Sequence, residues 1–244
     1  MNYKKPEIFP FGERAILINW EPIIDEKLLD FIILTKKHIQ KNKVKSIVEI
    51  TNTYSSLLIK YTDSINNIYD EISTLKTLIS EVEVGFSSSK KIFHLPICYE
   101  HEFGLDLKEI SATNQLEISE IISLHSSKIY TLFFIGFLPG FLYLGGLDKS
   151  LFFPRKKSPR KRVEKGAVGI AGNQTGIYPQ SSPGGWQIIG NCPLEMFEVR
   201  KKRPSIFSPG DKIKFHPVCR EEHKNILHQV KTGKYQIKTG NYEA

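Results

Sequence analysis

The spacing of apolar residues in the first ninety positions alternates between the period of a strand and that of a helix. Alternating or continuous short apolar runs predict strands, and apolar residues three and four positions apart predict amphipathic helices. The expected strands are residues 14–20, 44–50, 55–61 and 91–99, and the expected helices are residues 25–41 and 63–79. The order strand, helix, strand, strand, helix, strand is that of a ferredoxin-like split βαβ domain.

The pattern changes after Cys98. Two short helices are expected at residues 106–110 and 117–125. The sequence that follows them predicts short strands separated by glycine and proline residues. The strand candidates are residues 129–134, 167–170, 176–178, 186–189, 196–199 and 212–215. Many short strands with no helix between them predict a closed or nearly closed antiparallel β-barrel.

These patterns together predict an α+β chain in three parts. They are a ferredoxin-like domain at residues 1–90, a β-barrel domain at residues 91–220 and a C-terminal helix and tail at residues 221–244. Residues 85–90 are expected to connect the first two parts, and the polar end of the tail is expected to be loosely held.

Composition narrows the class of protein. With 40% hydrophobic and 25% charged residues, the chain matches an ordinary globular protein. The net charge is +8, and binding of an anionic substrate, an acidic protein partner or nucleic acid would each account for it. The three cysteines are widely spaced and form no CxxC pair, which excludes a zinc ribbon and favours a reducing compartment.

Targeting signals are missing from the sequence. The N-terminus has no apolar signal segment, and the longest apolar stretch, residues 132–144, is interrupted by glycine and proline. It is shorter than the ~20 residues that a membrane helix needs. We therefore expect a soluble, cytoplasmic protein that does not bind a membrane.

Common catalytic signatures are also missing. The sequence has no GxxxxGK[ST] loop, no GxGxxG after a strand, no HExxH, no EF-hand loop and no GxSxG elbow. No metal site is predicted, and a self-contained nucleotide site of the P-loop type is not expected.

Candidate chemistry is concentrated in residues 130–190. Seven basic residues lie between Phe152 and Lys165, and two of them, Arg155 and Arg160, stand beside prolines that would fix their loop. A guanidinium suits carboxylate and phosphate groups. The lysines are equally compatible with a solvated loop. Nucleic-acid binding would need aromatic residues interleaved with the charges, which this cluster does not have.

Polar side chains on a glycine-rich frame follow this cluster. Asn173, Gln174 and Tyr178 lie in GIAGNQTGIYPQ, and Gln187 follows a tryptophan in SPGGWQIIG. Primary amides donate and accept, which suits a lactam, ureido or amide substrate, although ordinary turn residues fit the pattern as well. His125, at the end of an amphipathic helix, is a candidate base or orienting group, with a buried structural histidine as the alternative.

Several spaced motifs together resemble one family. GFLPGFLYLGGLD, PRKKSPRKRV, GIAGNQTGIYPQ and SPGGWQIIG, with FGERAILINW and LPICYEHEFGLDL nearer the N-terminus, resemble the family of 5-oxoprolinase B subunits, also called the KipI or allophanate hydrolase subunit 1 family. The resemblance covers roughly residues 9–217. It implies an N-terminal α/β domain followed by a cyclophilin-like β-barrel.

The resemblance also implies a function. Members act with a direct partner, the 5-oxoprolinase C subunit, and with the A subunit to couple ATP hydrolysis to the opening of 5-oxoproline to glutamate. ATP, with Mg²⁺, would be held partly or wholly by the partners. Alternatives within the family are a KipI-like inhibitor of a histidine kinase and a component of an allophanate or urea amidolyase.

Residue chemistry, taken together with this reaction, leads to a hypothesis for each candidate residue. His125 and Arg155 are expected to be catalytic, with His125 orienting or deprotonating water and an arginine, Arg155 or Arg160, holding a carboxylate or phosphoryl group. The remaining substrate-binding candidates are Asn173, Gln174, Tyr178 and Gln187.

Overall fold

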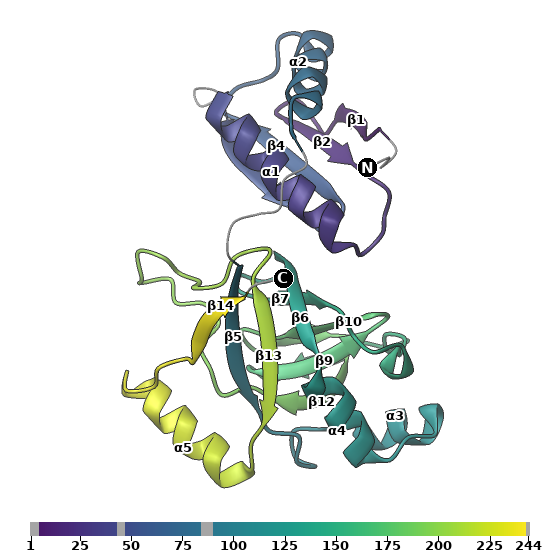
Figure 1. The fold of residues 1–244 in the computed structure, drawn as a ribbon, viewed down its shortest axis with the longest axis vertical. Helices are drawn as coiled ribbons and strands as arrows, with labels where there is room; N and C mark the ends of the chain where they lie inside the picture. The colour runs from purple at the N-terminus through teal and green to yellow at the C-terminus, as the bar shows by residue number, and fades with distance from the viewer. Residues whose placement is uncertain (1–4, 43–46, 84–89, 243–244) are drawn as a thin grey trace. The chain divides into compact units, whose positions relative to one another are not determined.

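The computed structural model describes residues 5–42, 47–83 and 90–242. The chain divides into two compact units, residues 1–88 and 89–244 (Figure 1). Each unit has a hydrophobic core of its own. The segment after residue 220 belongs to the second unit.

The first unit is a four-stranded sheet covered by two helices. Its elements are β1 (Glu7–Pro10), β2 (Ala15–Asn19), α1 (Glu26–Asn42), β3 (Ile47–Asn52), β4 (Ser56–Tyr61) and α2 (Ile68–Ser80). The strand order is β1-β2-β4-β3, and every pairing is antiparallel. Apolar residues of both helices join the same buried cluster as the sheet, so α1 and α2 cover one face.

The predicted fourth strand of a ferredoxin-like domain is wrong. Residues 90–97 instead form β5 in the sheet of the second unit. In the first unit β1 occupies the edge beside β2, paired from Glu7 with Asn19 to Pro10 with Ile16. This local hairpin satisfies the backbone groups along that edge, the position at which a fourth ferredoxin-like strand would pair. The strands predicted at residues 14–20 and 55–61 are confirmed, and residues 44–46 of the remaining one lie outside the described residues.

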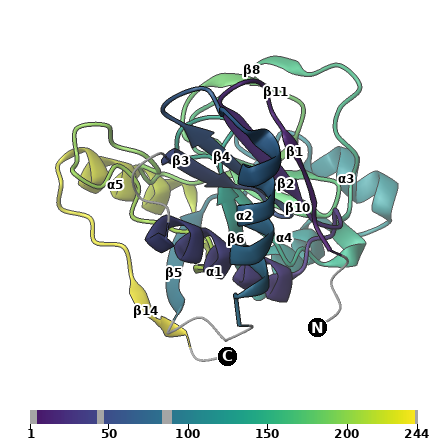
Figure 2. The same ribbon diagram turned by 90° about the horizontal axis from the view of Figure 1, so that it is seen from above.

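The second unit is built on an eight-stranded mixed sheet in the order β12-β9-β10-β7-β6-β13-β5-β14. A separate pair, β11 with β8, lies across this unit from β5 (Figure 2). The strands are β5 (Lys90–Ile97), β6 (Ile129–Ile135), β7 (Leu142–Gly145), β8 (Arg160–Val163), β9 (Ala167–Ala171), β10 (Gln174–Ile177), β11 (Ser182–Gly184), β12 (Gln187–Asn191), β13 (Lys212–Pro217) and β14 (Thr239–Tyr242).

The sheet is neither wholly antiparallel nor closed by a ladder of strands. β13 runs parallel to β5 over six residue pairs, which corrects the prediction of an antiparallel barrel. The segment that follows β5 meets β12 at one isolated bridge, where Cys98 and Asn191 exchange two backbone hydrogen bonds of 2.9 Å. The sheet therefore rolls around its core, and its two sides are joined by this bridge and by a backbone hydrogen bond of 2.8 Å from Asp106 N to the carbonyl oxygen of Ile188.

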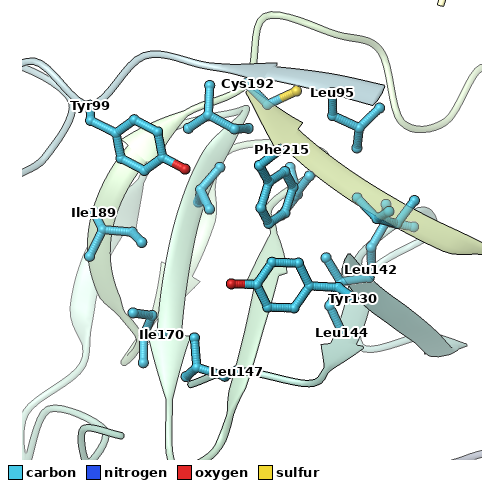
Figure 3. Close-up of a cluster of buried hydrophobic side chains, with 14 of the residues drawn as sticks. Leu95, Tyr99, Tyr130, Leu142, Leu144, Leu147, Ile170, Ile189, Cys192 and Phe215 are labelled. Atoms are coloured by element: carbon cyan, nitrogen blue, oxygen red, sulfur yellow. The ribbon is translucent and has the colours of Figure 1, made fainter. Parts of the chain in front are cut away.

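The rolled sheet encloses the main core of the second unit (Figure 3). Tyr130, Leu132, Ile170, Ile189 and Phe215 are at most 1% exposed within it. Burying such side chains contributes about 1.5–3 kcal/mol each. The strand predicted at residues 196–199 is wrong, because this segment is irregular and only its Met196 side chain reaches the core.

Helices flank the rolled sheet on two sides. They are α3 (Leu107–Asn114), α4 (Ile118–Ser127) and α5 (Arg220–Lys231), with a short 3-10 helix, η1 (Lys149–Leu151). α3 and α4 lie on one side of the unit and α5 on the other in both views (Figures 1 and 2). The polar end of the chain, expected to be loose, supplies edge strand β14 beside β5. No helix in the part of the chain that the structure describes is long and apolar enough to cross a membrane.

Gly166 provides a test of the turn between β8 and β9. It has φ +80°, and a β-carbon there would lie 2.3 Å from the carbonyl oxygen of Cys192. Gly166→Ala should lower the free energy of unfolding by more than the ~1–2 kcal/mol expected for a positive φ alone. The matched control is Gly172→Ala, at φ +59° with nothing within 4 Å of the added carbon. Equal melting temperatures for the two variants would contradict the predicted steric clash between a β-carbon at position 166 and the carbonyl oxygen of Cys192.

Candidate functional site

A cleft of about 410 Å³ lies in the second unit, beside the β8–β11 pair. Its lining comes from the loop between β6 and β7, the basic loop before β8, and the segment from β11 to Trp186. The residues that line it are Phe137, Leu138, Tyr143, Arg155, Pro159, Tyr178, Ser182, Pro183, Gly184, Gly185 and Trp186.

Aromatic rings form the inner wall of this cleft. Phe141, Tyr178 and Trp186 belong to a second buried cluster, separate from the core inside the rolled sheet. Phe141 contacts Tyr178, Tyr143 and Trp186 with ring centroids 4.9, 4.6 and 5.3 Å apart. Such mutual contacts fix ring orientation. The wall is therefore preformed and presents flat apolar surface with two phenol groups.

One cation faces this aromatic wall. The guanidinium carbon of Arg155 lies 5.8 Å from the centroid of the Trp186 ring, within the range of a cation–π contact. The backbone is anchored on both sides of Arg155. Gln187 Nε2 donates to the carbonyl oxygen of Pro154 at 3.1 Å, and Lys156 N donates to that of Gly185 at 2.7 Å. The arginine is thus exposed at the cleft on a segment of fixed position.

Asp106 connects this basic loop to the sheet. It is 3% exposed, and its carboxylate accepts from Arg160 Nη2 at 2.5 Å, Lys156 Nζ at 3.0 Å and Ile188 N at 2.6 Å. Arg160 also donates to the carbonyl oxygen of Trp186 at 3.5 Å. A buried carboxylate needs such partners. Arg160, one of the two arginines predicted to hold a carboxylate or phosphoryl group, is therefore engaged by Asp106, and Arg155 is the guanidinium that lines the cleft.

The two phenols of the cleft are held in the neutral form. Burial raises the pKa of Tyr143 and of Tyr178 above the usual value. Arg155 partly offsets this rise in the pKa of Tyr143, and a hydrogen bond from the Trp186 backbone offsets more of it than Arg155 does at Tyr178. A neutral phenol donates one hydrogen bond and accepts others. Both side chains can therefore bind a carbonyl or carboxylate oxygen as donors at neutral pH.

His125 lies inside the rolled sheet, away from the cleft. It is 0% exposed and stacks on Phe215 with centroids 4.9 Å apart. Its Nδ1 lies 2.7 Å from the hydroxyl of Tyr99, and its Nε2 lies 2.9 Å from that of Thr175. Figure 3 shows the hydroxyls of Tyr99 and Tyr130 pointing into this interior. The predicted role of His125 with water is not supported, because both ring nitrogens are occupied and no water can reach them.

The predicted amide residues also lie outside the cleft lining. Asn173 and Gln174 stand at the β9–β10 hairpin, at the opposite end of β10 from Tyr178. Tyr178 lies five residue steps along an extended chain from Asn173, a span of roughly 16 Å. Gln187 is 2% exposed and serves as the anchor for Pro154. Of the predicted residues, the structure brings Arg155 and Tyr178 to the cleft.

The sequence patterns did not predict several other residues of the site. In the sequence, Tyr143 and Phe137 are ordinary members of an apolar run. Asp106 is predicted only to begin a helix. The signals present were the glycine and proline spacing around Phe137 and a carboxylate preceding a short helix. Neither signal indicates which surface the side chain faces, because that depends on contacts over 50 residues away in sequence, such as Asp106 with Arg160.

Comparison with known families decides where this chain belongs. Residues 6–207 match the family described as carboxyltransferase domain, subdomain C and D. The chain belongs to this family.

Relatives with names extend the comparison. The chain is 35% identical to the 5-oxoprolinase B subunit of Haemophilus influenzae, with 85% of this chain and 96% of the relative covered. It is 32% identical to the 5-oxoprolinase B subunit of Bacillus subtilis, over 89% and 95% of the two chains. Among solved structures, the urea amidolyase of K. lactis superposes with a TM-score of 0.83 at 22% identity, over 99% of this chain and 17% of the amidolyase. That likeness shows a shared fold.

Within this family member, the cleft offers binding groups but no general base. Among the described residues that line it there is no aspartate, glutamate, histidine or cysteine. It offers one cation, neutral phenol donors, the Ser182 hydroxyl and flat apolar walls. This set suits a small monoanion with a hydrogen-bonding oxygen, and it holds no general base that would activate the Ser182 hydroxyl near neutral pH.

Asp106→Ala should destabilise the second unit. Removing the carboxylate leaves Arg160 and the Ile188 amide without this buried acceptor, at a cost of roughly 3–5 kcal/mol. The control is Glu109→Ala, since Glu109 pairs with the same Lys156 but is 52% exposed, which predicts less than about 1 kcal/mol. Urea unfolding of both variants measures the difference, and equal losses would contradict a special role for Asp106.

The burial of His125 predicts a pH dependence of stability. Burial lowers its pKa from 6.5 to about 3 in the folded chain. Below pH 6.5 the unfolded chain takes up a proton that the folded chain does not, so acidification lowers the free energy of unfolding. Between pH 7 and 5 this contribution is roughly 2 kcal/mol.

The measurement is urea unfolding at pH 7 and at pH 5 for the wild type and His125→Gln. The variant is expected to lose most of this pH-dependent component, whatever its stability at pH 7. His101→Gln, at an exposed position, is the matched control and should keep it. Parallel pH profiles for the wild type and His125→Gln would contradict the prediction.

Proposed function

We propose that this chain is the B subunit of an ATP-dependent 5-oxoprolinase, which opens 5-oxoproline to glutamate. The observation that carries the proposal is the similarity to two 5-oxoprolinase B subunits over 95% and 96% of their own lengths. Alignment over nearly the whole of a relative favours the same role in the same kind of assembly. We expect that assembly in the cytoplasm.

The cleft supports this substrate class. 5-Oxoproline is a small ring with one carboxylate and one lactam carbonyl. Arg155 would bind the carboxylate, Tyr143 and Tyr178 would donate to an oxygen of the ring, and Trp186 would pack against its apolar face. Binding in this way positions the lactam but does not activate it.

Activation is assigned to the other components of the enzyme. A lactam is a poor electrophile, and phosphorylating its oxygen with ATP creates a leaving group before water attacks the ring carbon. The cleft lining holds no carboxylate or histidine to serve as the base. We therefore expect the C subunit, in direct contact, and the A subunit to supply the base and to hold ATP with Mg²⁺.

A second candidate function is a role in another amide hydrolase. The shared fold with the K. lactis urea amidolyase favours it over a kinase inhibitor of the KipI type, for which the structure offers no specific feature. A cleft with one arginine and phenol donors also fits the carboxylate and amide of allophanate. The choice of substrate separates the two candidates.

The deciding experiment measures glutamate release from 5-oxoproline, with ATP, by the A and C subunits with and without this chain. Release that requires this chain supports the proposal. Assembly without turnover of 5-oxoproline, but with turnover of allophanate, supports the second candidate. Failure of the chain to assemble with the C subunit would refute both enzymatic roles and favour the kinase inhibitor.

Arg155→Gln should weaken substrate binding by the assembled enzyme. Loss of a charge-assisted hydrogen bond costs about 1.5–3 kcal/mol, which predicts a KM for 5-oxoproline roughly 10- to 100-fold higher. Arg162→Ala is the control, because Arg162 is 72% exposed, pairs with Glu164 and does not line the cleft. An unchanged KM in Arg155→Gln would remove this arginine from the site.

A further inference from the structure

One residue at the mouth of the cleft has an unusual backbone conformation. Phe137 has φ +65°, in the left-handed region that favours glycine. The amide of Leu138 donates to the carbonyl oxygen of Gly136 at 2.8 Å, which closes a three-residue turn centred on Phe137. A γ-turn with positive φ at its centre is rare and strained.

The loop that contains Phe137 is held firmly in this shape. Gly136 N donates to the carbonyl oxygen of Phe141 at 3.2 Å, and Phe141 N donates to that of Leu138 at 3.0 Å. These bonds lie between β6 and β7 and fix the loop at both ends. A glycine at position 137 would adopt the same turn without the steric cost of a β-carbon.

Burial of its own ring does not offset the strain at Phe137. The side chain is 64% exposed, and its one aromatic neighbour among the described residues is Phe141, in an edge contact with centroids 5.8 Å apart. The other non-glycine residue with positive φ in the described ranges is Gln115, which ends α3 as its C-cap. Helices commonly end in this way, so Gln115 has a local explanation that Phe137 lacks.

Strained residues that folding alone does not explain concentrate at ligand sites. Phe137 lines the cleft together with Arg155 and Trp186. We propose that Phe137 is a substrate-contacting residue that sets specificity, and that its ring covers the apolar face of a small cyclic carboxylate whose charge meets Arg155. This inference rests on the proposed function for the identity of the substrate.

The proposal predicts opposite effects on stability and on binding from one substitution. Phe137→Gly relieves the backbone strain and should raise the melting temperature of the chain by roughly 2–6 °C. Phe137→Ala keeps the β-carbon at positive φ and should not show this gain. Both variants lose the ring, so in the assembled enzyme both should raise KM for 5-oxoproline about ten-fold, with a smaller change in kcat.

Gln115→Gly is the matched control. It relieves positive φ at the end of α3, outside the cleft lining, so it should raise the melting temperature while leaving KM unchanged. A structural role for Phe137 predicts instead that Phe137→Gly loses stability. A role in contacting the C subunit predicts loss of copurification with it and an unchanged KM once the complex is saturated. Either result overturns the proposal.

A binding measurement on the isolated full chain separates this proposal from the proposed function. Trp20 and Trp186 are the two tryptophans, so Trp20→Phe leaves the cleft tryptophan as the single fluorophore. Titration with 5-oxoproline and with benzoate, a flat carboxylate unrelated to the enzyme reaction, reports occupancy beside Trp186.

Binding of either compound that weakens about ten-fold in Phe137→Gly supports the contact, even if the assembled enzyme does not turn over 5-oxoproline. Such binding without turnover would refute the proposed function but would still support Phe137 as a ligand-contacting residue. Binding that is equal in the wild type and in Phe137→Gly, or no binding of either compound to the wild type, overturns the inference.

Discussion

The rolled sheet of the second unit must bury both of its faces where β9, β10 and β12 lie. Every residue of β9 and β12 is buried. A strand with one solvent-exposed face would instead alternate between buried and exposed residues. One face, with Ile170, fills the interior, and the other is covered by the cluster of Phe141, Tyr178 and Trp186. This second cluster is itself buried, with Tyr178 1% and Trp186 5% exposed, and the cleft lies where the partly exposed Tyr143 and the exposed Arg155 border it.

Polar interactions then determine which charge reaches the cleft. Asp106, buried under the basic loop, engages Arg160 and Lys156 and ties them to the backbone of β12. A buried carboxylate with several donors is a strong positional constraint. It leaves Arg155, held between two anchored neighbours, as the guanidinium against the aromatic wall. The charge of the site is therefore set by a residue outside the cleft.

Two unusual local environments in the second unit, at His125 and Phe137, have different explanations. His125 carries a strongly perturbed pKa, yet every contact of its ring is internal and explains its presence through packing and hydrogen bonding. Phe137 carries a strained backbone and an exposed ring that internal contacts do not explain. A perturbed pKa alone therefore indicates burial here, whereas strain at a cleft indicates binding.

Sequence alone determined much of the local structure. Helical and strand periodicities located α1, α2, α4 and α5 and most strands of both units, because these periods reflect one buried face. The family was also evident from its spaced motifs, and two of the predicted site residues, Arg155 and Tyr178, line the cleft. Tertiary structure decided strand partners: β5 joins β13 in parallel, and β1 completes the first sheet. Backbone pairing between distant strands leaves no periodic signal.

The same limit applies to the site. Residue type suggested His125 as a catalytic residue and Asn173, Gln174 and Gln187 as substrate-binding residues, but a side chain's chemistry does not reveal which surface it faces. His125 lies in the core and Gln187 anchors a loop, whereas Tyr143, Asp106 and Phe137 shape the cleft or its rim. Their roles depend on contacts between segments far apart in the chain, and only folding brings those segments together.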